Sequence, residues 1–349
     1  MDVYTKALDL IAHGKPFAWA LVLKASGSTP QKSGAMALFE PSGPVWGTLG
    51  GGCLEAESRA RALRALDDGK PLAFDLSLDE DYGWDDGLIC GGKVRILIEP
   101  FPSRHAPAWK AAQEALARRE RGWLLTSLAD ETVQVRWVRE SESADLAELA
   151  SEDDLLASLD TERPLYREAS SLSIASIEPI VAPPRLLIAG GGHVGQALAR
   201  LGVFLGFEVT VVDDRALFTD PQRYPEGVRT VCADIADTVA AFPAAADTYI
   251  VIVTRGHRHD ADVLERCIHV PAAYLGMIGS KRKILLIRKQ FIERGIATEE
   301  DFARVHSPMG LDIGSVTVPE IATSIAAELV AVRRKRTGAG RSLSIGQPA

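Results

Sequence analysis

The pattern of hydrophobic and polar residues differs between the first and second halves of the chain. In the first third, an amphipathic stretch at residues 3–12 predicts a helix, and the Ala-, Leu- and Arg-rich stretch 54–68 predicts another. Apolar runs of strand length lie between and after these stretches, at residues 17–23, 35–39, 45–49 and 94–98. We therefore expect an N-terminal α/β domain over residues 1–184.

The pattern changes after Pro183-Pro184, a pair that can continue neither a helix nor a central strand. Apolar runs of strand length then alternate with helical patterns, starting with a strand at 185–189, a helix at 194–205 and a strand at 208–212. Such alternation favours a parallel sheet with crossover helices. We predict a Rossmann-like domain with a parallel sheet over residues 185–349.

The middle of the chain is less informative. Residues 123–128 and 133–138 have the pattern of a β-hairpin. Residues 140–162 hold nine acidic side chains and no basic one. Two interpretations stay open for this acidic stretch: a solvated helical face or a patch that binds a partner.

Composition narrows the class of protein. Of the 349 residues, 46% are hydrophobic and 25% charged, which is typical of a folded chain of about two domains. The net charge of −8 argues against nucleic acid as a partner. No apolar run reaches the roughly 18 residues of a membrane helix, and four cysteines are too few for a disulfide framework. We expect a cytoplasmic protein that binds no membrane.

The glycine-rich residues 190–195 (GGGHVG) match the G-x-G-x-x-G pattern, and they lie between a predicted strand and a predicted helix. In that setting Gly190 permits a tight turn, Gly192 lets the backbone approach a diphosphate, and Gly195 lets helix and strand pack closely. Asp213 ends the next strand, near the spacing of about 20 residues at which a carboxylate holds a ribose hydroxyl. The pattern is also compatible with a dinucleotide fold that has lost its nucleotide.

A second glycine turn, residues 50–53 (GGGC), also joins a strand to a helix and predicts an anion-binding cradle. Cys53 would enter that helix, where the positive end of the helix dipole favours a thiolate. Cys90 is flanked by glycines and is expected in a loop, whereas Cys232 and Cys267 lie in apolar segments and are expected to be buried. Cys53 and Cys90 could instead be inert small residues in tight turns. A zinc site is not expected, because no C-x-x-C pair exists.

Two later loops carry further candidates. His257, His259 and Asp260 follow a strand and could hold a metal, although contact with a ligand or capping of a helix by Asp260 fits as well. Residues 276–282 form another glycine-containing turn with cations that suit a phosphate. Ser280 could equally serve there as the cap of a helix.

Taken together, these motifs resemble those of the XdhC/CoxI family, the xanthine dehydrogenase accessory factors. The shared segments are 27–30 (GSTP), 50–55 (GGGCLE), 88–100, 190–195, 212–215 (VDDR), 274–283, 306–314 and 319–328. The resemblance covers both halves of the chain and leaves out only residues 101–184.

The resemblance implies an accessory factor rather than an enzyme. Such proteins bind molybdenum cofactor (molybdopterin), protect its sulfurated form and deliver it to a xanthine dehydrogenase-type molybdoenzyme, with a cysteine desulfurase as a second partner. A phosphate, a pterin and a soft metal centre would suit anion-binding turns and a thiol. We expect the cofactor where the glycine turns of the two domains meet. A homodimer is a default expectation for soluble proteins.

We assign no catalytic residue. The predicted cofactor-binding residues are Ser28, Thr29, Gly50, Gly51, Gly52, Cys53, Glu55, Cys90, Gly91, Gly190, Gly192, His193, Gly195, Asp213, Arg255, His257, Gly279 and Ser280. Cys53 and Cys90 are expected to make the soft contact to molybdenum. An alternative function is an NAD(P)-dependent oxidoreductase, and a third is a sulfur-relay protein that carries a persulfide on Cys53.

Overall fold

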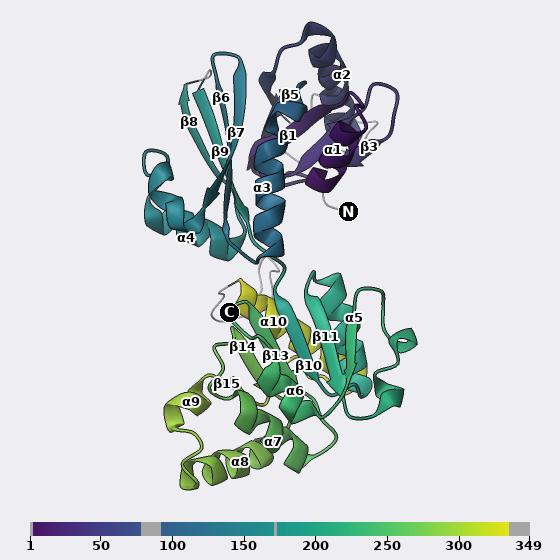
Figure 1. Ribbon diagram of the computed structural model, residues 1–349, viewed down its shortest axis with the longest axis vertical. Helices are drawn as coiled ribbons and strands as arrows, with labels where there is room; N and C mark the ends of the chain where they lie inside the picture. The colour runs from purple at the N-terminus through teal and green to yellow at the C-terminus, as the bar shows by residue number, and fades with distance from the viewer. Residues whose placement is uncertain (1–2, 78–91, 171–172, 335–349) are drawn as a thin grey trace. The chain divides into compact units, whose positions relative to one another are not determined.

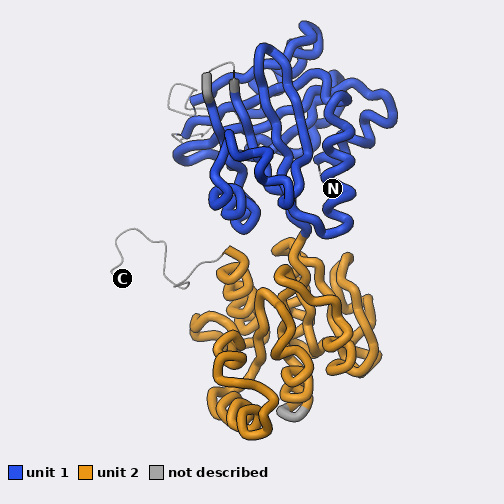
Figure 2. Tube along the Cα trace, turned by 60° about the vertical axis from the view of Figure 1, so that its left-hand side comes forward, with its two compact units in different colours: residues 1–182 blue, residues 183–349 orange. Residues whose placement is uncertain are grey.

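The structure is a computed structural model that describes residues 3–77, 92–170 and 173–334, without the side chains of 169, 170, 173, 257 and 258. The chain divides into two compact units (Figure 2): unit 1 is residues 1–182 and unit 2 is residues 183–349. Within the described ranges, no helix combines the length and the apolar character that crossing a bilayer requires.

Unit 1 begins with an antiparallel sheet whose strand order is β3-β2-β1-β5-β4. Its strands are β1 (Ala18–Ser26), β2 (Met36–Phe39), β3 (Val45–Gly47), β4 (Leu72–Ser77) and β5 (Lys93–Glu99). The helices α1 (Val3–Ala12) and α3 (Ala106–Ala117) share one hydrophobic core with this sheet, and α2 (Gly52–Asp68) shares another.

The central strand β1 explains the unbroken apolar run at residues 17–23. Trp19 and Leu21 pack in the core that contains α1 and α3, whereas Ala20 and Val22 pack in the core that contains α2. Because successive side chains of a strand point to opposite faces, a strand covered on both faces has no polar position.

A second antiparallel sheet completes unit 1, with strand order β7-β6-β9-β8 (Figure 1). Its strands are β6 (Gly122–Ala129), β7 (Thr132–Arg139), β8 (Leu165–Ser170) and β9 (Ser173–Ile180). The predicted hairpin is the β6–β7 pair. The short helix η3 (Pro102–His105) precedes α3.

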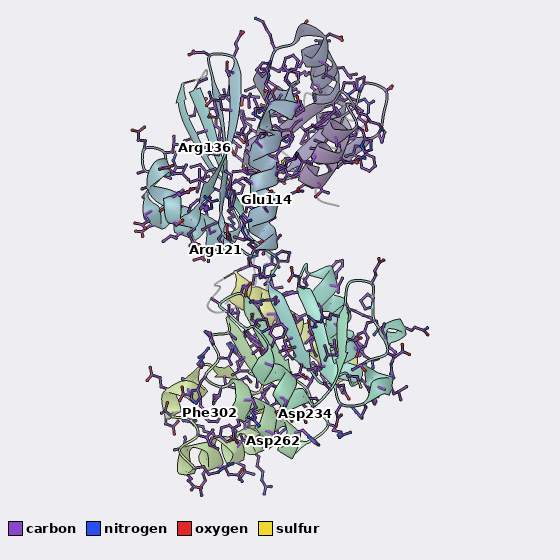
Figure 3. All side chains as sticks on the ribbon, viewed as in Figure 1. Glu114, Arg121, Arg136, Asp234, Asp262 and Phe302 are labelled. Atoms are coloured by element: carbon purple, nitrogen blue, oxygen red, sulfur yellow. The ribbon has the colours of Figure 1, made fainter. Side chains whose placement is uncertain are left out.

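The acidic stretch forms the helices η4 (Glu140–Leu146) and α4 (Glu152–Thr161). Arg121, just before β6, forms an ion pair with Asp160 at 3.2 Å. Arg136 on β7 forms another with Asp145 at 3.3 Å; both arginines are labelled in Figure 3. Pairs this exposed contribute little stability, but they partly neutralise the acidic stretch with arginines from the same unit.

Unit 2 is built on a six-stranded sheet in which every neighbouring pair is parallel. Its order is β12-β11-β10-β13-β14-β15, which is the strand order of a Rossmann fold. The strands are β10 (Arg185–Ala189), β11 (Glu208–Asp213), β12 (Arg229–Cys232), β13 (Thr248–Ile252), β14 (Tyr274–Met277) and β15 (Val305–His306). The predicted fold class, an α/β domain followed by a Rossmann-like domain with a parallel sheet, is confirmed.

Helices cover both faces of this sheet. Leu186 and Ile188 of β10 share a core with α5 (His193–Phe204) and α10 (Val318–Arg333). Leu187 and Ala189 pack in the other core. The helices on that side are α6 (Ile235–Ala241), α7 (His257–Cys267), α8 (Lys281–Glu293) and α9 (Glu299–Ala303); the short helices η5 (Ala216–Phe218) and η6 (Pro221–Arg223) follow β11.

The two cysteines of unit 2 differ in exposure. Cys267 is fully buried on α7, as expected, and its burial raises its pKa to about 12. Cys232 is exposed, so the prediction that it is buried is wrong. It ends β12, which is an edge strand with one neighbour, and an apolar sequence context does not reveal an edge position.

Candidate functional site

The glycine turn of unit 1 depends on glycine at three consecutive positions. It follows β3 and begins α2, with φ of +121° at Gly50, +75° at Gly51 and +57° at Gly52. These are left-handed conformations that residues with a Cβ atom rarely adopt. The sequence GGG is therefore required by the path of the backbone.

Glu55, near the start of α2, stabilises the glycine turn through hydrogen bonds to its side-chain carboxylate. One carboxylate oxygen, Oε1, accepts hydrogen bonds from Thr48 Oγ1 (2.5 Å), Leu49 N (3.0 Å) and Gly51 N (3.1 Å). Burial opposes ionisation of Glu55, but these three hydrogen bonds outweigh it, so the pKa of the carboxyl is lowered. Two backbone amides at this turn thus donate to a carboxylate of the same chain, and the binding of an external anion there stays a prediction.

Three of the motifs found in the sequence lie against one another in unit 1. A Cβ atom added to Gly50 would lie 2.5 Å from Pro30 Cβ, and one added to Gly92 would clash with the carbonyl of Ser28 and the methyl group of Thr29. The loop 27–30 is therefore packed against the 50–53 turn and against Gly92. The predicted Cys90 and Gly91 lie outside the described residues, and Gly92 is the next residue along the chain.

Cys53 stands at this junction, in the first turn of a helix of 17 residues. It is partly exposed rather than packed in the core. The positive end of the α2 dipole favours negative charge at this position. A Cβ atom at Gly51 would meet no atom within 4 Å, so open space lies beside the turn.

In unit 2 the turn 190–195 packs tightly at three of its four glycines. A Cβ atom would clash with Val253 O at Gly190, with Phe218 O at Gly191, and with the carbonyl of Gly190 at Gly195. At Gly192, which caps α5, a Cβ atom would meet nothing within 4 Å. The backbone thus has the tight turn expected at Gly190 and the close packing expected at Gly195, while the approach of a diphosphate to Gly192 stays a prediction.

Asp213, predicted to hold a ribose hydroxyl, instead binds its own unit at every acceptor position. Oδ1 accepts hydrogen bonds from Arg215 N (3.1 Å) and Nε (2.8 Å), and Oδ2 accepts from Gly191 N (2.8 Å) and Arg215 Nη2 (2.9 Å). Asp213 is only 1% exposed. Burial opposes its ionisation, yet the bonds from Arg215 and Gly191 outweigh burial and lower its pKa.

The loop between β13 and α7 reaches the same edge of the sheet, where the parallel strands end. Arg255, after β13, donates to Asp214 Oδ2 at 2.7 Å. Asp260 is buried in α7, accepts from Thr254 N (3.1 Å) and Thr254 Oγ1 (2.5 Å), and forms an ion pair with Lys283. Asp260 therefore ties the start of α7 to the loop before it, a structural use rather than a metal ligand.

The remaining predicted residues have varied surroundings. Ser280 caps α8 by accepting from Lys283 N at 3.4 Å, while His193 and Ser280 are exposed and Gly279 is partly buried. The side chain of His257 lies outside the described residues. Among the residues that are described, no three His, Cys, Asp or Glu side chains form a group suited to a metal ion.

Sequence reasoning missed three residues that matter to these turns. Thr48 and Arg215 complete the hydrogen bonding around the two carboxylates, and the cation that pairs with Asp260 is the partly buried Lys283 rather than Lys281 or Arg282. A signal existed only for Arg215, which directly follows the Asp213-Asp214 pair.

Two protein families match the chain. The XdhC Rossmann domain matches residues 186–329, and the XdhC and CoxI family matches residues 10–76. The first match contains the 190–195 turn and the second contains the 50–53 turn. Each unit therefore carries its own family signature.

Several known proteins are similar over nearly the whole chain. The uncharacterized protein YqeB of Escherichia coli is 26% identical over 97% of this chain, which spans 47% of YqeB, about half its length. A probable xanthine dehydrogenase component of Bacillus subtilis is 25% identical, covering 90% of this chain and 93% of that protein. The molybdenum cofactor insertion chaperone PaoD of E. coli is 22% identical, covering 94% of this chain and 86% of PaoD.

The fold is shared with a solved structure. The crystal structure of a xanthine dehydrogenase from Bacillus halodurans superposes with a TM-score of 0.75 at 23% identity, covering 97% of this chain and 98% of that one.

Proposed function

Since the chain belongs to the XdhC/CoxI family, we propose that it binds molybdenum cofactor and inserts it into a xanthine dehydrogenase-type enzyme. The similarity to PaoD, which is named a molybdenum cofactor insertion chaperone, supports the insertion role. The probable xanthine dehydrogenase component of B. subtilis supports the class of target.

The observation that carries the proposal is the junction in unit 1. The 27–30 loop, the 50–53 turn and Gly92 pack together around the start of α2, where Cys53 is accessible and Gly51 borders open space. A thiol suits the soft metal centre of the cofactor, and backbone amides at a helix start suit its phosphate. The donors present in unit 1 therefore fit this cargo.

The residues of the junction would have distinct roles. Cys53 would contact the metal end of the cofactor, with Cys90 as a second thiol, and Ser28 and Thr29 would border the site. Glu55 would hold the turn in shape through Oε1, which accepts from Thr48, Leu49 and Gly51. Its second carboxylate oxygen would contact the pterin.

Metal loading tests this proposal. The wild type, Cys53→Ala and Cys232→Ala proteins would be purified from cells that make the cofactor, and bound molybdenum and pterin would be measured. Cys232 is the matched control because it is the more exposed of the two thiols and lies in unit 2. We expect Cys53→Ala to lose most of its molybdenum while Cys232→Ala keeps it. Equal loading of Cys53→Ala and wild type would remove the thiol from the site.

Transfer tests the second half of the role. Loaded protein would be mixed with a cofactor-free xanthine dehydrogenase, and the returning enzyme activity would be followed. If the chaperone carries the sulfurated form, prior incubation with a cysteine desulfurase and cysteine should raise that activity. Sedimentation of the free protein would test the expected homodimer.

A further inference from the structure

A second ligand site in unit 2 is indicated by what surrounds Asp213. An ionised carboxylate has about four acceptor positions, and Arg215 and the Gly191 amide occupy four positions on Asp213. A ribose hydroxyl that approached the end of β11 would find no free acceptor on this side chain. The arrangement by which a Rossmann fold commonly holds an unmodified ribose is therefore closed.

The Arg215 guanidinium, next to the end of β11, is a group that could bind a ligand here. Arg215 uses Nε and Nη2 to bind Asp213, whereas its third nitrogen, Nη1, donates to no residue that the structure describes. Its side chain is 32% exposed. The guanidinium lies 3.8 Å from the centre of the Phe218 ring, so its plane is fixed by stacking as well as by the ion pair.

Phe218 is itself held in place. The Tyr224 hydroxyl donates to the carbonyl of Phe218 at 2.5 Å, and Arg223 packs near the same ring at 5.1 Å. Arg223 Nη1 donates to the carbonyl of Leu217. An aromatic ring with two arginines thus stands beside the glycine turn, on the side where β11 ends.

Three arginines lie at this edge. Arg215 pairs with Asp213, Arg255 pairs with Asp214, and Arg223 lies near the Phe218 ring. Arg255 is 45% exposed and uses one nitrogen to bind Asp214. Arg215 follows the end of β11 and Arg255 follows the end of β13, the edge at which ligands of open parallel sheets bind.

We propose that unit 2 binds a nucleotide whose ribose carries an additional phosphate, as NADP does, and that Arg215 is the residue that selects it. The diphosphate would lie at the open Gly192, and the extra phosphate would accept from Arg215 Nη1. Arginine binds phosphate through charge-assisted hydrogen bonds, which are stronger than the hydrogen bond that Arg215 could make to an uncharged ribose hydroxyl. This inference does not depend on the cofactor proposed for unit 1.

Titration of the full chain with NADPH and NADH, followed by nucleotide fluorescence, tests the inference. We expect NADPH to bind at least about tenfold more tightly than NADH, the effect of one charge-assisted contact. In Arg215→Gln the ratio should fall to about threefold or less. Arg288→Gln, which removes a surface arginine of α8, should leave the ratio unchanged.

Competition by 2′,5′-ADP against 5′-ADP on the wild-type protein gives a readout that does not rely on any variant folding. Stronger competition by 2′,5′-ADP is expected, and it should weaken as salt is added. Equal affinities, a preference for NADH, or no binding of either nucleotide at millimolar concentration would overturn the proposal. Molybdenum loading, measured on the same preparations, reports separately on unit 1.

Discussion

The two glycine turns use the same kind of internal contact, but the carboxylate that makes the contact is held differently in each. Each lies between a strand and a helix, and in each a carboxylate accepts a hydrogen bond from the amide of the second glycine: Glu55 from Gly51 at 3.1 Å, and Asp213 from Gly191 at 2.8 Å. The amides of such a turn are thus partly used before any ligand arrives. A glycine turn before a helix is not by itself a vacant anion site.

The difference lies in what holds each carboxylate. Asp213 comes from a neighbouring strand, is fully buried and is neutralised by Arg215 at every remaining acceptor position. Glu55 comes from the helix that the turn itself begins, is partly exposed and forms no ion pair with a described residue. We therefore expect the turn of unit 2 to act as a fixed scaffold and the turn of unit 1 to be the one that can exchange an internal contact for a ligand.

The largest effect that would test this contrast is expected at Gly195. In Gly195→Ala the new Cβ would clash with the carbonyl of Gly190, so overpacking should lower the free energy of unfolding by about 3 kcal/mol. Gly192→Ala is the matched control: its Cβ would meet open space and its φ is −65°, so stability should change by less than about 0.5 kcal/mol. Denaturant unfolding measures both. Equal destabilisation of the two variants would mean that unit 2 is not the tight scaffold described.

A smaller loss is expected from Asp213→Asn. The amide cannot accept at every position that the carboxylate does, and the Arg215 charge loses its partner, which should cost about 2 kcal/mol. The same unfolding experiment would detect it. Arg215→Gln should cost less, because Arg215 is one-third exposed and its charge can be solvated. A neutral outcome for Asp213→Asn would show that the network is not needed to hold the turn.

Glu55→Gln should cost only about 1 kcal/mol. The glutamine oxygen can still accept from Thr48, Leu49 and Gly51, so the variant removes charge rather than the contacts themselves. If Glu55→Gln lowered the free energy of unfolding as much as Asp213→Asn does, the proposed difference between the two turns would be wrong.

Much of this arrangement could be predicted from local sequence. The tight turn at Gly190 and the close packing at Gly195 follow from the absence of a Cβ atom, and the sequence also indicates Ser280 as a helix cap, which it is. These features depend on residues close together in the chain. Local patterns are sufficient for them.

The rest depends on contacts that local patterns do not encode. Cys232 is exposed because β12 lies at the edge of its sheet, and strand order is set by the whole fold. In the sheet of residues 122–180, the sequence pattern predicts only the β6–β7 hairpin, because β9 pairs with β6 across a long separation in sequence. Likewise, nothing in the spacing tells that the Asp213 carboxylate is filled by Arg215 rather than left for a ribose.

The smallest and most discriminating effect is the dependence of stability on acid. Both carboxyl groups have a lowered pKa in the folded chain. Each therefore stabilises the fold fully above its unfolded pKa of about 4, and this contribution is lost as the pH falls through the lowered folded pKa. Asparagine or glutamine does not titrate, so the stability gap between wild type and each variant should narrow between about pH 5 and pH 2.

Unfolding by urea at a series of pH values would measure the two gaps. The narrowing should be greater for Asp213→Asn, because Arg215 adds a charge partner that Glu55 lacks among the described residues. Gln222→Ala, which alters a surface position of unit 2 without removing a titrating group, should give a curve parallel to wild type. If the Asp213→Asn curve also ran parallel to wild type, the buried pair would not be what stabilises the second turn, and the distinction between a fixed and an exchangeable turn would lose its electrostatic basis.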